Sequence, residues 1–251
     1  MQAEGFVKGR PTELAVLNYG LFKVHSNGRI IGICGFVIRT EAGELILIDT
    51  GLPAKYATDT DAAVKEDRLF EFGEVLICGP DNLPEAQLAK LGIKPADVTL
   101  QICTHTHIDH VGGLGDFPAS PILISAAERA LRRPLYWGDV QPLEWPNRNY
   151  FEVEGDVEIG PGLTVLAAPG HAPGQIAMMV DLPSGAFLLT SDAISRSAEI
   201  DEKFAGSWDE QAAIASADRL MRLASQRDAF VIYGHCPEQW PELKKAPEFY
   251  R

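Results

Sequence analysis

The segment 105–110 reads HTHIDH and places three of the chain's six histidines and one aspartate within six positions. Neutral imidazole nitrogens and carboxylate oxygens are good ligands for borderline divalent metal ions. In an extended or looping segment His105 and His107 can point the same way. Asp109 and His110 are then turned toward a neighbouring position. The hexapeptide therefore predicts two ligands for each of two nearby metal ions.

Two metal ions need more donors than this segment offers, because a catalytic zinc typically takes about three protein ligands and one water. Three further donors each end an apolar run elsewhere in the chain, and Asp192 among them could bridge because a carboxylate has two oxygens. The predicted set is two triads and a bridge: His105, His107 and His171 for the first metal ion, Asp109, His110 and His235 for the second, and Asp192 between them.

A dinuclear centre suits hydrolysis. Free water has a pKa of about 15.7, and a metal ion can lower that pKa to about 7. The difference corresponds to about 11–12 kcal/mol in favour of hydroxide. A second metal ion can polarise a carbonyl group or hold a leaving oxygen as it gains charge.

Two more polar residues are interpreted from their surroundings. Asp49, in the stretch LIDTG, could accept a hydrogen bond from a ligand histidine and fix its tautomer. The alternative is a turn aspartate that bonds its own backbone. His25 precedes the Asn27-Gly28 turn signal, so we expect it in a surface turn.

Short apolar runs that stop at these polar residues are expected to be the strands that position them. Runs rich in Val, Ile, Leu and Phe suit strands that are buried on at least one face. The expected strand regions are 35–51, which reads as a hairpin, and 98–105, 163–171, 186–192 and 229–235.

Helices are expected between the strands. Ser125 with Glu128, and Ser207 with Glu210, have the spacing of a capping box. Strands mixed with helices predict the α/β class. The sequence contains no repeat, low-complexity segment or flexible linker, so we predict one domain over residues 1–251. The expected helices cover residues 83–92, 125–133 and 207–224.

Residues 52–82 and 131–151 do not follow the alternation of strands and helices. Long irregular segments in compact domains are often lids or binding loops. The alternative is an aromatic-rich surface that packs on the core or on another subunit, and the sequence leaves both open.

The composition argues against nucleic-acid and membrane partners. The chain has 251 residues, 46% of them hydrophobic, and a net charge of −13, whereas binding to phosphates usually needs a basic face. No stretch reaches the length of a membrane span, and we read no secretory signal at the start. The four cysteines form no CxxC pair, so we expect free thiols in a reducing cytoplasm.

The motifs HTHIDHVGG, APGHAPG, LLTSDA and IYGHC occur in this order and resemble those of the metallo-β-lactamase superfamily. The stretches ILIDTG, GDVEIGPGLTVLAAPGHAPG and FAGSWDEQAAIASADRL resemble its N-acyl-homoserine lactonase branch. The resemblance implies an αββα sandwich of two mixed β-sheets with outer helices. It also implies a dinuclear site, usually zinc, with the ligand roles given above, the opening of a lactone ring, and often a homodimer.

The leading interpretation is a metal-dependent lactonase that acts on N-acyl-homoserine lactones, a quorum-quenching activity, or on another small lactone. Asp109 would relay the proton and Asp192 would bridge the metal ions, and these two are the candidate catalytic residues. The aromatic segments would hold the acyl chain. The alternatives are a thioesterase of the glyoxalase II type and a persulfide dioxygenase with a single iron.

Two positions depart from the branch. Many of its members have a tyrosine shortly after the bridging aspartate, where this chain has Ile194 and Ser195. The residue before the metal-binding Asp109 is often Phe, and here it is Ile108. Both differences concern the pocket, and they leave the identity of the lactone open.

Overall fold

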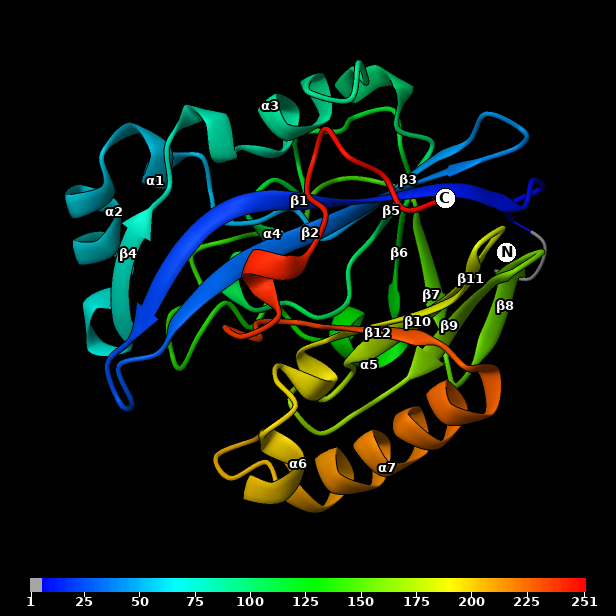
Figure 1. Cartoon of the computed structure of the whole chain (residues 1–251). Helices are drawn as coiled ribbons and strands as arrows, with labels where there is room; N and C mark the ends of the chain where they lie inside the picture. Colours follow the sequence, from blue (N-terminus) through cyan, green and yellow to red (C-terminus); the bar gives the residue numbers. More distant parts are fainter. Residues whose placement is uncertain (1–5) are drawn as a thin grey trace.

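The computed structural model describes residues 6–251, which fold around two β-sheets that face each other. Figure 1 shows α3 above the first sheet and α7 below the second. Each sheet contains both parallel and antiparallel neighbours. The predicted αββα sandwich of mixed sheets is therefore confirmed.

The first sheet has seven strands in the order β4-β1-β2-β3-β5-β6-β7. β1 and β2 form a long antiparallel hairpin, and β3, β5, β6 and β7 run parallel to one another. The strands are β1 (Pro11–Val24), β2 (Ile30–Thr40), β3 (Leu45–Ile48), β4 (Gly73–Ile77), β5 (Leu100–Ile102), β6 (Ile122–Ser125) and β7 (Tyr150–Val153).

The second sheet has five strands in the order β12-β11-β10-β9-β8. Its neighbours are antiparallel except for β11 and β12, which are parallel. The strands are β8 (Val157–Gly160), β9 (Leu163–Ala167), β10 (Ile176–Leu182), β11 (Gly185–Ser191) and β12 (Phe230–Tyr233).

The helices are short apart from α7. Short 3-10 turns connect several elements, and the one that matters most for the site is Asp192–Ile194. The helices are α1 (Lys55–Thr58), α2 (Thr60–Glu66), α3 (Pro84–Ala89), α4 (Ile108–Val111), α5 (Ala126–Arg129), α6 (Glu199–Glu202) and α7 (Glu210–Arg227).

The apolar core has three layers, and the alternation of side chains along β1 shows how the first two arise. Leu14 and Val16 belong to the cluster between the sheets, whereas Ala15 and Leu17 belong to the cluster on the outer face of the first sheet. Successive side chains of a strand point to opposite faces, so a strand covered on both faces reads as a nearly continuous apolar run. The third layer, which includes Leu220, lies between the second sheet and α7.

The expected strand regions are confirmed, and they end where the polar candidates begin. β3 and β5 are parallel, with Ile48 paired to Ile102. Because parallel strands end at the same edge of a sheet, Asp49 and the segment that begins at Cys103 lie side by side. The Asp49 N–H donates to the Ile102 carbonyl oxygen at 2.9 Å.

The capping box expected for Ser207 and Glu210 is wrong. α7 begins at Glu210, and Asp209 caps it by accepting a hydrogen bond from the Ala212 N–H. Asp209 can cap the helix because its backbone is extended, with φ at −139°. The Glu210 carboxylate instead accepts from the Gly206 N–H.

Ser125 caps α5 as expected, since its hydroxyl accepts a hydrogen bond from the Glu128 N–H at 3.2 Å. The second half of the predicted box is absent. The Glu128 carboxylate turns inward and bonds Thr106 and Gly174 instead of the helix start.

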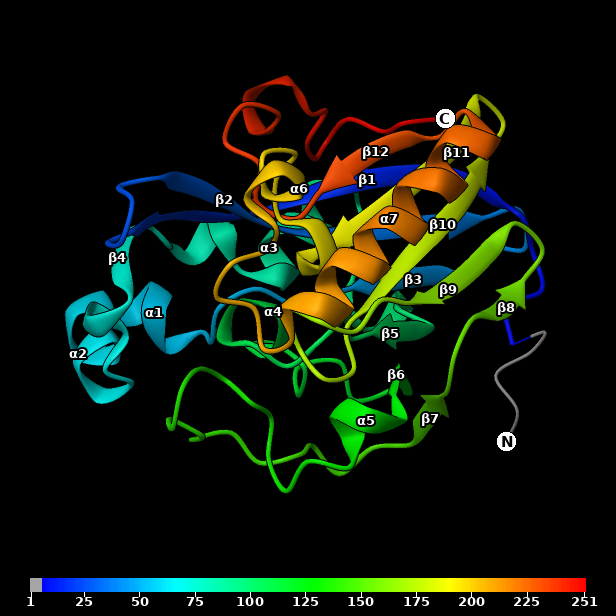
Figure 2. The ribbon, with the colours of Figure 1, turned by 90° about the horizontal axis from the view of Figure 1, so that it is seen from below.

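The two segments that look irregular in the sequence differ in the structure. Residues 52–82 contain α1, α2 and the edge strand β4, so the expectation of an irregular segment is wrong there. Residues 131–149 have no named helix or strand, and Figure 2 shows them as a long excursion between α5 and β7. His25 lies exposed in the turn between β1 and β2, as expected.

The segments 52–72 and 131–149 are fastened together by one buried carboxylate, Asp67, which is 1% exposed. It accepts hydrogen bonds from the hydroxyl groups of Tyr56 and Tyr136 and forms an ion pair with Lys55.

Within residues 6–251, no helix combines the length and apolar character that crossing a bilayer needs.

We expect Tyr136→Phe to lower the free energy of unfolding of the metal-free protein by about 1.5–3 kcal/mol, because it removes a buried hydrogen bond to a charged acceptor. Urea denaturation measures the change. Tyr250→Phe is the control, because among residues 6–251 the Tyr250 hydroxyl accepts only from the exposed Lys244 N–H. Equal losses in the two variants would contradict a special role for Asp67.

Candidate metal centre

The structure brings all seven predicted ligands together from both sheets. Each lies in a loop or short turn that follows a strand: His105 and His107 after β5, Asp109 and His110 on α4, His171 between β9 and β10, Asp192 directly after β11, and His235 after β12.

The first predicted triad is compact. His107 Nδ1 lies 3.0 Å from His105 Nε2 and 2.9 Å from His171 Nε2. The three donor atoms all lie within 4.8 Å of one another. Burial lowers the pKa of His107 to about 3 and holds the pKa values of His105 and His171 below their usual value. These imidazoles are therefore neutral near pH 7, and the neutral form is the metal ligand.

The second predicted triad is more polar. His235 Nε2 lies 3.3 Å from Asp109 Oδ2, and His110 Nε2 lies 3.7 Å from Asp109 Oδ1. Burial disfavours a charged imidazole, but Asp109 and Asp49 outweigh it and raise the pKa of His110 to about 9. Burial also opposes charge at His235, yet its pKa is raised, chiefly by Asp192. A bound cation would replace the protons that these imidazoles otherwise hold.

Asp192 faces both triads. Its Oδ2 lies 3.4 Å from His171 Nε2, whereas its Oδ1 lies 3.2 Å from His235 Nε2 and 3.6 Å from His110 Nε2. The preceding Ser191 has a φ of +47°, a strained value for a residue with a side chain. The two carboxylate oxygens thus have the placement that a bridging ligand needs.

The donor set fits a pair of divalent cations. Within residues 6–251, His110 Nε2 and Asp192 Oδ1 are buried and have no hydrogen-bond partner. A buried polar atom without a partner costs about 1–3 kcal/mol. Coordination to a cation would satisfy both atoms, and nitrogen and carboxylate donors are those that zinc accepts.

Asp49 makes the contact that the sequence predicts with a ligand histidine. Its Oδ2 lies 2.8 Å from His110 Nδ1 and accepts from the Thr104 hydroxyl, while its Oδ1 accepts from the Thr104 N–H. A proton held on Nδ1 leaves the Nε2 lone pair free for a metal ion. His235 is held in the same way, because its Nδ1 donates to the Gly32 carbonyl oxygen at 2.8 Å.

Sequence reasoning missed two supports of the site. The Thr104 hydroxyl lies 2.8 Å from the Ser191 hydroxyl, which links the residues before His105 and Asp192. Glu128, assigned from its spacing to a helix cap, lies buried beneath the loops of the first triad. Spacing along the chain carries no signal for either contact, because both join segments that meet only in the fold.

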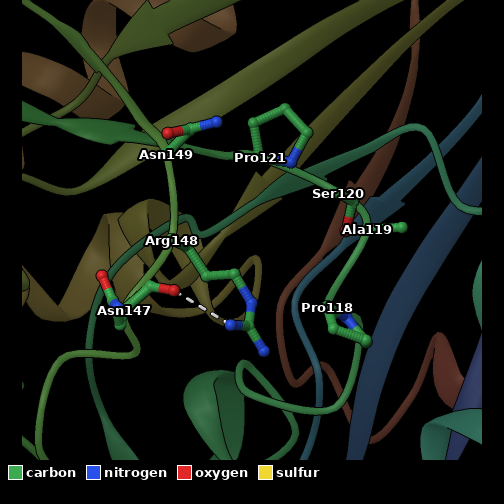
Figure 3. Close-up of a pocket in the computed structure, with 7 residues that line it drawn as sticks. All are labelled: Pro118, Ala119, Ser120, Pro121, Asn147, Arg148 and Asn149. Carbon is green, nitrogen blue, oxygen red and sulfur yellow. Dashed lines mark hydrogen bonds between the residues drawn. The ribbon is translucent and has the colours of Figure 1, made fainter.

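A polar hollow of about 240 Å³ lies away from these donors. It is lined by residues 118–121 and 147–149, and Figure 3 shows these residues, with the Arg148 guanidinium donating to the carbonyl oxygen of its neighbour Asn147. None of its lining residues is one of the seven donors. The chemistry indicated by the sequence therefore belongs to the histidine cluster.

Comparison with known proteins matches most of this chain to a described family. Residues 35–235 match the family model of the metallo-beta-lactamase superfamily. Over 225 aligned residues the chain is 36% identical to an N-acyl homoserine lactonase of Bacillus cereus. The alignment covers 85% of this chain and 85% of that protein.

Two solved structures are similar over nearly the whole chain. One is a mutant of AiiA from B. thuringiensis with N-decanoyl-L-homoserine bound at the active site. It superposes with a TM-score of 0.81 and 25% sequence identity, and the match covers 96% of this chain and 100% of that chain. An N-acyl homoserine lactone hydrolase with the product N-hexanoyl-L-homoserine bound at the catalytic metal centre has a TM-score of 0.80, 25% identity and the same coverage.

Asp49→Asn should weaken the metal affinity of the protein by about 10–100-fold, because the amide offers one acceptor oxygen in place of two. Asn tolerates the left-handed backbone of Asp49, whose φ is +58°, so the loop should keep its shape. Competition with a chromophoric chelator measures the affinity.

Asp228→Asn is the matched control, because Asp228 is also left-handed, with a φ of +49°, but lies exposed at the end of α7. If both variants bound metal as tightly as the unmodified chain, Asp49 would not orient His110.

Proposed function

The chain belongs to the metallo-β-lactamase superfamily, in its N-acyl homoserine lactonase branch, and from this we propose that it is a metal-dependent hydrolase that opens the lactone ring of N-acyl homoserine lactones. This is a quorum-quenching activity. The observation that carries the proposal is the convergence of seven nitrogen and carboxylate donors in two triads and a bridge. The relatives with this activity support the choice of substrate.

We assign the resident metal as two divalent cations, with Zn²⁺ as the proposed identity. When bound, they supply Lewis-acid activation of water and of the lactone carbonyl. The ligand roles proposed for this chain are His105, His107 and His171 for one cation, Asp109, His110 and His235 for the other, and Asp192 for both.

Asp109 is proposed to relay the proton of the attacking water to the ring oxygen. Its side chain is 18% exposed, against 8% for Asp192, so it is the more accessible carboxylate. Burial alone would raise its pKa, but His110 and His235 outweigh that effect and lower it to about 2. Asp109 is therefore ionised, and its position beside His110 and His235, not its basicity, supports the proposed relay. The Asp192 carboxylate holds the two halves of the centre together.

An aromatic pair beside the ligand loop is proposed to contact the acyl chain. The rings of Phe72 and Trp137 lie 6.4 Å apart, and Phe72 is half-exposed. Tyr136, which precedes Trp137, accepts a hydrogen bond from the Ile108 N–H at 2.8 Å. This contact fixes the aromatic segment directly next to Asp109.

Two of the positions that depart from the branch, Ile108 and Ile194, are apolar and buried in this chain. Ile108 is 6% exposed and Ile194 is 0% exposed. The Ser195 N–H donates to the Glu199 carboxylate, and its carbonyl oxygen accepts from the His235 N–H. We propose that this chain orients the lactone carbonyl without a tyrosine at this position.

The proposal is tested by a hydrolysis screen of the purified protein with its metal content measured. We expect about two metal ions per chain and turnover of N-acyl homoserine lactones of several acyl lengths above that of simple esters and thioesters. Faster turnover of a glutathione thioester would favour a thioesterase of the glyoxalase II type. One iron per chain with persulfide oxidation would favour a dioxygenase.

Asp192→Asn and His171→Ala should each lower lactonase activity by more than about 100-fold, because losing a direct ligand should exceed the 10–100-fold effect of losing an outer partner. Circular dichroism checks that the fold is retained. Asp181→Asn is the control, because the Asp181 carboxylate forms an ion pair with the surface residue Arg227, away from the seven donors. Full activity in either ligand variant would refute the proposed centre.

We further propose that residues 1–251 form one domain that works in the cytoplasm. Both sheets contribute to the same central cluster, with Phe36 from the first and Met178 from the second. Four free cysteines, three of them buried, suit a reducing compartment.

A homodimer is also proposed, formed through the edge strand β4. Phe70, Leu76 and Ile77, on or next to β4, are 38–50% exposed, and apolar edges of this kind are usually covered. Ile77→Lys should then produce a monomer in sedimentation equilibrium. Phe230→Lys, at a similarly exposed position on β12, an edge strand of the second sheet, should not; a monomeric unmodified chain would contradict the dimer.

A further inference from the structure

Glu128 is a buried carboxylate outside the predicted ligand set. It lies on α5 and is 0% exposed. Among residues 6–251 it forms no ion pair within 4.0 Å. A charge buried in this way destabilises the fold unless hydrogen bonds replace its water, so its partners should matter.

The two oxygens of Glu128 bind two different loops. Oε2 accepts hydrogen bonds from the Thr106 N–H at 3.0 Å and from the Thr106 hydroxyl at 2.6 Å. Oε1 accepts a hydrogen bond from the Gly174 N–H at 3.0 Å. The carboxylate thus accepts three hydrogen bonds, two from the loop that contains Thr106 and one from the loop that contains Gly174.

Both loops carry ligands of the first triad. Thr106 stands between His105 and His107, in the loop after β5 of the first sheet. Gly174 follows His171 by three residues, in the loop between β9 and β10 of the second sheet. Glu128 therefore spans the place where the two sheets each contribute imidazoles to one pocket.

We propose that Glu128 is a positioning residue that sets the distance between these two loops and thereby the metal affinity of the first triad. This inference rests on the proposed metal centre. It extends that centre to a residue that neither binds the metal ion nor hydrogen-bonds a ligand side chain.

The packing around Gly174 supports a fixed separation. A Cβ atom at Gly174 would lie 2.1 Å from the Ser125 hydroxyl and 2.7 Å from the Glu128 nitrogen. The second glycine of the motif APGHAPG is therefore required by the close approach of this loop to the start of α5. The Thr106 hydroxyl also accepts from the Leu135 N–H at 2.8 Å, which ties the aromatic segment to the same carboxylate.

Glu128→Gln is the decisive variant, because glutamine has the same shape but only one acceptor oxygen. Its amide nitrogen must face the N–H of either Thr106 or Gly174, so one loop is released. Titration of the metal-free protein with Zn²⁺ against a chromophoric chelator should show one of the two equivalents bound roughly 10-fold more weakly, and the other unchanged.

Two single-triad backgrounds assign the weakened equivalent. In His235→Ala only the first triad is complete, and adding Glu128→Gln should weaken Zn²⁺ binding there. In His171→Ala only the second triad is complete, and the same change should have no effect. Loss of affinity in both backgrounds, or in neither, would overturn the assignment to the first triad.

Further variants separate positioning from general stability. Thr106→Val removes the hydroxyl and should weaken the same equivalent, whereas Thr106→Ser keeps it and should restore the affinity. Leu220→Ala, in the layer under α7, should lower the melting temperature of the metal-free protein but leave both affinities unchanged.

The proposal fails if Glu128→Gln and Thr106→Val lower only the melting temperature, as Leu220→Ala does, and bind both equivalents as tightly as the unmodified chain. If the unmodified chain bound only one equivalent of Zn²⁺, the proposed dinuclear centre would be wrong, and the role of Glu128 in positioning the first triad would be wrong with it. Lactonase activity does not enter this comparison, so failure of the substrate proposal stays separate.

Discussion

The central constraint in this protein is that two buried atoms, His110 Nε2 and Asp192 Oδ1, have no hydrogen-bond partner among the described residues. Both atoms are shielded from water and make no hydrogen bond within residues 6–251, although Asp192 Oδ1 lies within ion-pair distance of the His235 and His110 rings. Such atoms persist in a folded protein when something else stabilises the arrangement. Neutral imidazoles on one side and carboxylates on the other leave a pocket that suits cations, and the rest of the fold can be understood as the means of holding it.

The sandwich supplies that support because its strands end at the ligands. β3 and β5 bring Asp49 beside the histidine-rich loop, and β11 and β12 bring Asp192 beside His235. Each sheet alone carries an incomplete ligand set. The apolar layer between the sheets therefore does more than stabilise the fold, because packing the sheets together also brings the two partial ligand sets next to each other.

Buried polar side chains then adjust what the strands bring together. Asp49 fixes the tautomer of His110, and Glu128 joins the loops of the first triad. Asp67 works one step further out, where it fastens the aromatic segment 131–149 to the segment 52–72. Each is an acceptor enclosed by several donors, an arrangement that is stiff because any movement leaves a buried charge exposed to apolar surroundings.

The class of fold, the strands that end at polar residues and the grouping of the seven donors could all be predicted from the sequence, because HTHIDH and the three isolated donors are local signals of residue type and spacing. The sequence also indicated Asp49. Three features emerge only in the folded chain: Glu128 faces inward instead of capping its helix, residues 52–82 contain an edge strand, and Asp67 joins two distant segments. Those contacts link residues far apart in the chain, so neither periodicity nor spacing encodes them; they follow from which surfaces the packed sheets bring together.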